Sequence, residues 1–121
     1  MSGVICVGLG GGAGAVLRYG ISLIPYKGTF PLLTLVTNLL GALLIGVIAG
    51  TAARKNLSPN LVLFLKTGVC GGFTTFSTFS LEAHTLIEKG HYGMAAGYML
   101  LSVLFCLAGV AAGMYAAEQI C

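Results

Sequence analysis

Polar side chains recur inside strongly apolar stretches of this sequence, at spacings that place them on shared helix faces. Asn38 follows Thr34 by four residues, and Ser102 follows Tyr98 by four. An amide or a hydroxyl group donates hydrogen bonds to a small anion without the fixed positive charge that would trap it. These residues therefore predict a polar path across a membrane. Hydrogen bonding between packed helices is the alternative for each of them.

A second group of such residues follows two glycines, where residues 71–80 read GGFTTFSTFS. Paired glycines before a β-branched threonine pair are poor helix formers, so we predict a helix break near residues 71–75. Phe76 and Phe79 share a face, and the positive edge of a phenyl ring attracts an anion weakly. A tight helix crossing and ordinary aromatic packing are the alternatives. Further hydroxyl groups that could extend the polar path belong to Ser77, Thr78 and Ser80.

Two charges lie furthest inside the apolar stretches, Arg18 and Glu82. At the mouth of a pore, Arg18 would raise the local anion concentration, and Glu82 would line the path or pair with a cation. The alternative for Arg18 is that its long side chain reaches back to the membrane surface.

Other classes of chemistry lack the residues they need. The sequence has no Asp, and its three Glu residues are widely separated, which argues against a carboxylate pair for hydrolysis. The four cysteines form no C-x-x-C motif, and the six Lys and Arg residues form no basic stripe for nucleic acid. We therefore expect neither an enzyme nor a nucleic-acid-binding protein.

Membrane-spanning helices must position these side chains, because 57% of the residues are hydrophobic and only 7% are charged. Four apolar runs, at about residues 4–24, 32–53, 61–87 and 92–117, each reach the length of about 20 residues that a spanning helix needs. We predict one four-helix transmembrane domain over residues 1–121. Glycine pairs four residues apart would let the helices approach closely, at Gly8/Gly12, Gly10/Gly14, Gly46/Gly50, Gly93/Gly97 and Gly109/Gly113.

The positive charges are divided evenly between the two sides of these four spans. Arg54, Lys55 and Lys66 lie toward the side of the termini, whereas Arg18, Lys27 and Lys89 lie toward the other side. The positive-inside rule then favours neither orientation. Insertion in both orientations is the simplest consequence, and opposed copies could pair as an antiparallel dimer.

Three segments together resemble the CrcB or Fluc family of bacterial fluoride channels: residues 11–19 (GGAGAVLRY), 34–41 (TLVTNLLG) and 71–82 (GGFTTFSTFSLE). The resemblance extends over essentially the whole chain, and the third segment is the most specific. It implies an all-α membrane protein with four transmembrane helices per subunit, a broken third helix and an antiparallel, dual-topology homodimer in the bacterial inner membrane. The implied activity is passive, fluoride-selective export that limits fluoride toxicity.

The same resemblance implies roles for individual residues. The carbonyl oxygens of Gly71 and Thr74 would bind a structural sodium ion at the dimer centre, which is not transported. Arg18 and Glu82 would lie at the vestibule. The fluoride pore would be lined by Asn38, Phe76, Phe79, Tyr98 and Ser102, together with Thr34, Ser77, Thr78 and Ser80.

Two other kinds of small membrane protein are alternatives. A multidrug-type exporter would need a membrane-embedded carboxylate in its first span, where this chain has Arg18 and no acid. A nonconducting accessory subunit would use its glycine-rich faces only to pack against a larger complex. Transport of an organic cation would identify the exporter, and the absence of any ion flux would identify the accessory subunit.

Overall fold

The computed structural model describes residues 2–121, which form helices and connections with no β-strand in that range. The third span is assembled from several short helices, whereas each of the others is one helix. Four helical segments are long and apolar enough to cross a membrane, which confirms the predicted all-α fold. The helices are α1 (Ser2–Ser22), α2 (Leu32–Arg54), α3 (Pro59–Val62), the π-helix η1 (Leu63–Cys70), α4 (Gly71–Phe73), α5 (Phe76–Glu88) and α6 (Tyr92–Ile120).

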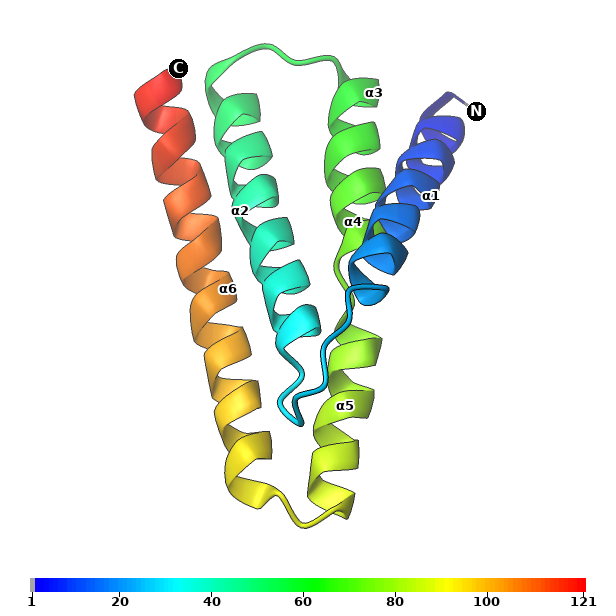
Figure 1. The fold of residues 1–121 in the computed structure, drawn as a ribbon. Coiled ribbons are helices and arrows are strands. Elements are labelled where there is room, and N and C mark those ends of the chain that lie inside the picture. The colour runs from blue at the N-terminus through cyan, green and yellow to red at the C-terminus, as the bar shows by residue number, and fades with distance from the viewer. Residues whose placement is uncertain (1) are drawn as a thin grey trace.

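The helices pack as two close pairs, shown in Figure 1: α2 lies along α6, and α1 lies against η1 and α4. Both chain ends lie at the end of the molecule that also carries the connection from α2 to α3 (Figure 1). The turn between α5 and α6 lies at the opposite end. This arrangement brings α2, α6 and the interrupted third span around one region, where the polar residues of the predicted path meet.

Glycines make both close pairs possible. A Cβ atom on Gly10 or Gly14 of α1 would overlap backbone carbonyl oxygens of η1, and one on Gly46 of α2 would overlap a backbone carbonyl oxygen of α6. Such contacts between helix backbones are typical of small residues in membrane proteins. The pairs Gly8/Gly12 and Gly93/Gly97 were also predicted to allow close helix contacts. They make none in this chain, because a Cβ atom there would meet nothing within 4 Å.

The third span is interrupted at Thr74 and Thr75, within the range predicted for a break. Both residues have extended backbone angles, φ −86° and ψ 159° at Thr74 and φ −150° and ψ 114° at Thr75. Thr75 then caps the next helix, because its Oγ1 accepts a hydrogen bond of 3.1 Å from the backbone N–H of Thr78. The chain thus leaves one helix and starts another within two residues.

A Schellman motif ends α5 and turns the chain into α6. Gly90 has a φ of 81°, a conformation that glycine adopts without strain. The backbone N–H of Gly90 donates to the carbonyl of Ile87 at 3.0 Å, and that of His91 donates to the carbonyl of Leu86 at 2.9 Å. This tight turn makes α6 return antiparallel to α5.

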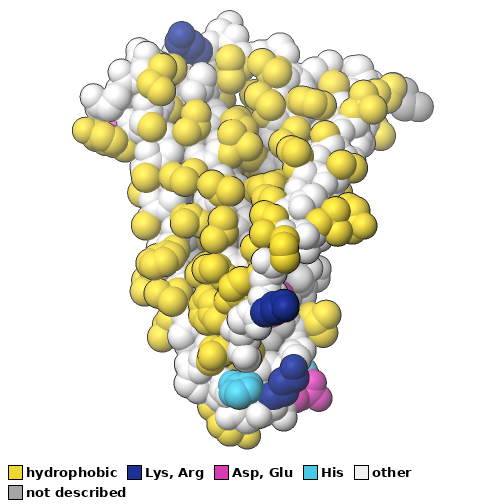
Figure 2. Space-filling model, viewed as in Figure 1, with side chains coloured by type: hydrophobic (Ala, Val, Ile, Leu, Met, Phe, Trp, Pro, Cys, Tyr) yellow, Lys and Arg dark blue, Asp and Glu magenta, His cyan; other side chains and the backbone are white. Residues whose placement is uncertain are grey.

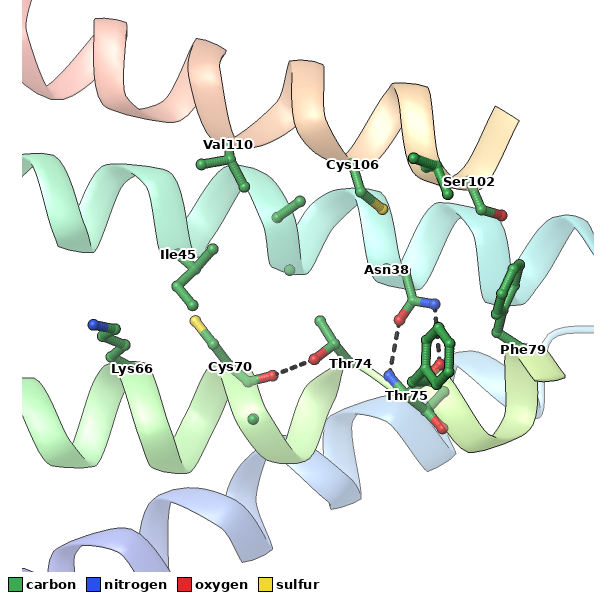
Figure 3. Close-up of a pocket in the computed structure, with 15 residues that line it drawn as sticks. Asn38, Ile45, Lys66, Cys70, Thr74, Thr75, Phe79, Ser102, Cys106 and Val110 are labelled. Carbon is green, nitrogen blue, oxygen red and sulfur yellow. Dashed lines mark hydrogen bonds between the residues drawn. The ribbon is translucent and has the colours of Figure 1, made fainter. Parts of the chain in front are cut away.

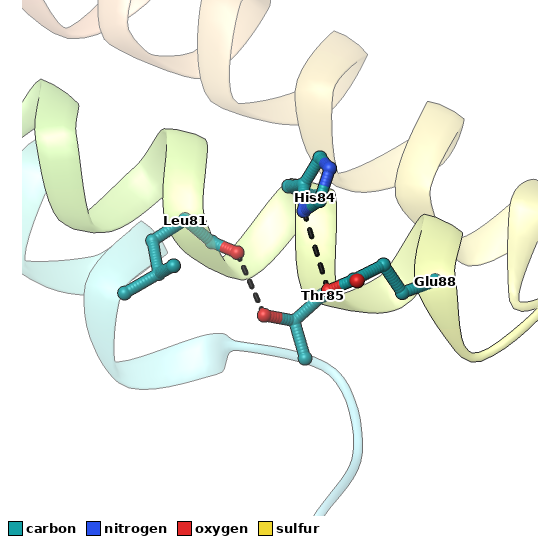
Figure 4. A network of polar contacts seen from close by, with 4 residues as sticks. All are labelled: Leu81, His84, Thr85 and Glu88. Atoms are coloured by element: carbon teal, nitrogen blue, oxygen red, sulfur yellow. Dashed lines mark hydrogen bonds and ion pairs between the residues drawn. The ribbon is translucent and has the colours of Figure 1, made fainter.

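Apolar side chains cover much of the face shown in Figure 2, and most of its charged side chains lie toward the two ends, with a Lys or Arg side chain between them. Two polar pairs lie near those ends: the ion pair of Arg54 with Glu118 at 3.5 Å, and the contact of His84 Nδ1 with Glu88 at 3.3 Å (Figure 4). Both pairs are well exposed, so they contribute little to stability. The distribution is that of a protein whose middle faces lipid.

Candidate functional site

A pocket of about 380 Å³ lies between α2, α6 and the interrupted third span (Figure 3). Polar and aromatic residues predicted for the pore line it together with small and aliphatic ones. Four of the predicted pore residues and both predicted sodium ligands line this pocket, and two of the pore residues are on helices other than the third span. The lining residues are Asn38, Gly41, Ala42, Ile45, Lys66, Cys70, Gly71, Thr74, Thr75, Phe76, Phe79, Ser102, Val103, Cys106 and Val110.

The side chain of Asn38 hydrogen-bonds to both backbone polar groups of Thr75 at the helix break, as the dashed lines in Figure 3 show. Its Nδ2 donates to the carbonyl oxygen of Thr75 at 3.1 Å, and its Oδ1 accepts from the backbone N–H of Thr75 at 2.8 Å. One of the two amide N–H groups is thereby used, and the other is left for the pocket. Asn38 therefore holds the break in place as well as lining the cavity.

Two backbone carbonyls beside the break lose the partners that a continuous helix would give them. The N–H of Thr75 would bond Gly71 but donates to Asn38, and the N–H of Thr78 would bond Thr74 but donates to the hydroxyl of Thr75. No hydrogen bond to either carbonyl oxygen is found among residues 2–121. Gly71 is exposed, and open space lies where its side chain would be. These oxygens can accept a cation or a donor from outside the chain.

The two predicted pore phenylalanines stand next to each other but differ in burial. Their ring centroids are 5.5 Å apart. Phe79 also packs on the ring of Tyr98 at 5.0 Å and contacts the buried cluster between α2, α5 and α6. Phe76 is 79% exposed and points outward. Phe79 is thus packed against the core of this chain, whereas the ring of Phe76 is exposed to the surroundings of the chain.

Tyr98 and Ser102, predicted to line the path together, have different environments. Tyr98 is fully buried under Phe30 and Phe79, and its hydroxyl donates to Glu82 Oε1 at 3.1 Å. Glu82 is therefore paired with a tyrosine, and no cationic side chain among residues 2–121 pairs with it. The hydroxyl of Ser102 is buried on the pocket wall and has no hydrogen-bond partner in the described part of the chain. A buried hydroxyl without a partner costs about 1–3 kcal/mol, so an occupant that accepts its hydrogen bond would be favoured.

Arg18 lines a second, smaller pocket of about 130 Å³. Two of the predicted hydroxyl residues, Thr34 and Thr78, line it as well. Thr75 lines both pockets, so the helix break separates them. The Nε of Arg18 donates to the carbonyl oxygen of Gly72 at 3.1 Å. Arg18 therefore does not simply reach back to the membrane surface but is anchored beside the break.

Two more predicted pore residues, Ser77 and Ser80, lie outside both pockets, as Tyr98 and Glu82 do. The Ser80 hydroxyl donates to the carbonyl of Phe76 at 2.9 Å within its own helix, and Ser77 is exposed with its hydroxyl 3.4 Å from that of Thr75. Conversely, Lys66, Cys70 and Cys106 line the first pocket and were not predicted. For Cys106 a signal existed, because it follows Ser102 by four residues on the same helix face.

Comparisons with known proteins agree with the sequence motifs. A family model described as "CrcB-like protein, Camphor Resistance (CrcB)" matches residues 5–114. The chain is 46% identical over 114 residues to a protein of Methylobacterium sp. (strain 4-46), with 92% of each chain covered. It is 47% identical over 121 residues to one of Ruegeria sp. (strain TM1040), covering 97% of this chain and 95% of the other. Both are named "Fluoride-specific ion channel FluC". A match of this length and identity means that the chain belongs to the CrcB family.

Proposed function

We propose that this chain forms a fluoride-selective channel. The observation that carries the proposal is the buried, unpartnered hydroxyl of Ser102, which shares a pocket with the free amide N–H of Asn38 and the rings of Phe76 and Phe79. Fluoride is small and strongly hydrated, so leaving water requires several short hydrogen bonds from uncharged donors. The relatives' name, fluoride-specific ion channel, supports the same ion.

Conduction is passive, and its direction is set by the electrochemical gradient. Hydrogen fluoride enters a bacterium from an acidic medium and dissociates in the neutral cytoplasm, which traps the anion. A negative-inside membrane potential then drives fluoride outward, since moving one charge is worth about 2.3 kcal/mol per 100 mV. A channel in the inner membrane would thereby limit fluoride toxicity.

Efflux from liposomes tests the function directly. The purified chain is reconstituted in vesicles loaded with fluoride, the voltage is collapsed with a potassium ionophore, and release is recorded with a fluoride electrode beside a chloride control. Fast fluoride release without chloride release is expected. Silence from folded protein would contradict the proposal and favour a nonconducting accessory subunit.

The functional unit in this proposal is an antiparallel homodimer with a sodium ion at its centre. Three cations lie on each side of the four spans, so both orientations are open to the chain. The face around the break is incomplete, because Gly71 and Phe76 are exposed there. The carbonyls of Gly71 and Thr74 fit a structural sodium ion, since unwound backbone carbonyls at membrane depth coordinate such ions.

Removing sodium should loosen this dimer. We expect purification with N-methyl-D-glucamine in place of sodium to lower both the dimer fraction, measured by size exclusion with light scattering, and the fluoride efflux. Returning sodium should restore both. An equally stable, equally conducting dimer without sodium would contradict the assignment, and a monomer in both buffers would contradict the dimer.

Replacing either phenylalanine should reduce conduction while leaving the dimer intact. We expect Phe76→Ile and Phe79→Ile to lower fluoride efflux about tenfold, because each removes a ring edge from the anion's path. Phe79→Ile should also lower the melting temperature, since Phe79 packs on buried Tyr98. Phe105→Ile is the matched control, because Phe105 is exposed on α6 and lines neither pocket. Native efflux from both pore variants would remove the proposed role of the rings.

A further inference from the structure

Among residues 2–121, Lys66 is the one charged side chain that lines the first pocket. It belongs to η1, a π-helix, a form that is rare and frequently found at functional sites. Figure 3 places Lys66 at one end of the pocket, with Phe79 and Ser102 near the other end and Asn38 between. The donors that would bind an anion and the charge that would attract one thus share a cavity but occupy different parts of it.

No acidic side chain neutralises this lysine in the described part of the chain. In residues 2–121, Glu118 pairs with Arg54 and Glu88 contacts His84. Glu82 is bonded to Tyr98. An unpaired ammonium within a membrane-spanning segment is costly unless water solvates it. Lys66 is exposed, so water can solvate its ammonium group at that end of the pocket, where its positive charge is free to attract mobile anions.

The position of Lys66 also keeps it from holding an anion too tightly. It precedes Thr74 by eight residues, which is at most about 12 Å along the helix axis at the rise of an α-helix. At that distance its charge attracts an anion toward the donors without contacting it there. Arg18 cannot replace it, because Arg18 is bonded to Gly72 and lines the other pocket.

We propose that Lys66 lies at the mouth of the first pocket and that its positive charge concentrates small anions from water before they reach Asn38 and Ser102. This inference rests on the proposed fluoride conduction and adds a specific residue that governs its rate. A fixed charge at a water-filled mouth acts through the local ion concentration, so its effect must depend on ionic strength.

A charge series at Lys66 tests the proposal. Fluoride efflux at subsaturating fluoride is measured for Lys66→Arg, Lys66→Gln and Lys66→Glu at about 10 mM and about 1 M potassium isethionate, where the screening length falls from about 30 Å to about 3 Å. At low salt, we expect Lys66→Gln to conduct about two- to fivefold more slowly than the parent, and Lys66→Glu more slowly still. Lys66→Arg should match the parent, and the differences should vanish at high salt.

Lys55→Gln is the matched control, because it removes an equal charge from an exposed residue outside both pockets. It should conduct like the parent at both salt concentrations. The series is repeated in vesicles of neutral lipid and of anionic lipid. An effect confined to anionic vesicles would overturn the proposal, since Lys66 would then be binding lipid phosphate.

Other results would also overturn it. Equal efflux from the parent and Lys66→Gln at low salt would mean that the charge does not act on the anion. A loss of equal size at both salt concentrations, not rescued by arginine, would mean that Lys66 is needed for folding. In each case the parent still conducts fluoride. A parent that conducts none would overturn the proposed function itself, and this inference with it.

Discussion

Gly14→Ala is expected to destabilise the folded chain by about 3 kcal/mol, the upper range for overpacking a close-packed site. An alanine Cβ at this position would overlap the carbonyl oxygen of Val69 and lie 2.7 Å from the backbone N of Phe73. Both neighbours are backbone atoms of the interrupted span, so no side chain can rotate away. The helices α1 and η1–α4 would have to separate, and the break between α4 and α5 would lose its support.

Gly12→Ala provides the control for this change, because it lies on the same helix and a Cβ there meets nothing within 4 Å. Alanine is the better helix former, so this variant should be as stable as the parent or slightly more stable. Thermal melts in detergent, followed by circular dichroism and by the fraction of monodisperse protein, measure both. Equal melting temperatures for the two variants would contradict the backbone contact at Gly14.

The apolar runs were sufficient to predict the four spans, because crossing about 30 Å of hydrocarbon requires long apolar helices whatever the tertiary fold. Helix ends were less predictable. The first span ends at Ser22, not near residue 24, and α6 continues to Ile120 beyond the predicted end near residue 117. Glycine spacing indicated close packing but not its partner, so Gly8/Gly12 and Gly10/Gly14 looked alike in the sequence while only the second pair contacts η1.

The break was predictable from residues 71–75, but its position and its stabilisation were not. The paired glycines at 71 and 72 remain helical or cap a helix, and the chain extends at Thr74 and Thr75 instead. The reason lies 37 residues away in the sequence, where Asn38 offers both an acceptor and a donor to Thr75. Local propensity predicts a weak point, and only the tertiary contact decides which peptide bond leaves the helix.

Helix spacing likewise predicted which side chains of the site share a helix face, but not how deeply each side chain is buried. The four-residue spacing of Tyr98 and Ser102 placed both on one face, yet Tyr98 is covered by aromatic rings and only Ser102 reaches the pocket. Lys66 was counted as a charge on the side of the termini, since nothing in the sequence brings it to the wall that it shares with Asn38. Side-chain depth depends on residues of other helices, which periodicity does not specify.

Asn38→Asp is expected to lower fluoride efflux about 100-fold, equivalent to about 3 kcal/mol. One carboxylate oxygen can still accept from the N–H of Thr75, as the amide oxygen does at 2.8 Å. The other replaces Nδ2, which donates to the Thr75 carbonyl at 3.1 Å, so two oxygens would face each other there. A negative charge would also stand in the path of an anion. The change thus removes both the hydrogen bond to the Thr75 carbonyl and the amide donor that would bind the ion.

Two further variants separate those effects. Asn56→Asp makes the same chemical change on an exposed loop and should leave efflux and stability unaltered. Asn38→Ala removes both hydrogen bonds without adding charge and leaves the Thr75 N–H unpaired, which costs about 1–3 kcal/mol. It should therefore lower the melting temperature as well as the efflux. If Asn38→Ala conducts poorly yet melts like the parent, Asn38 does not hold the break. Near-native efflux from Asn38→Asp would exclude Asn38 from the conduction path, because a carboxylate beside a passing anion cannot be without effect.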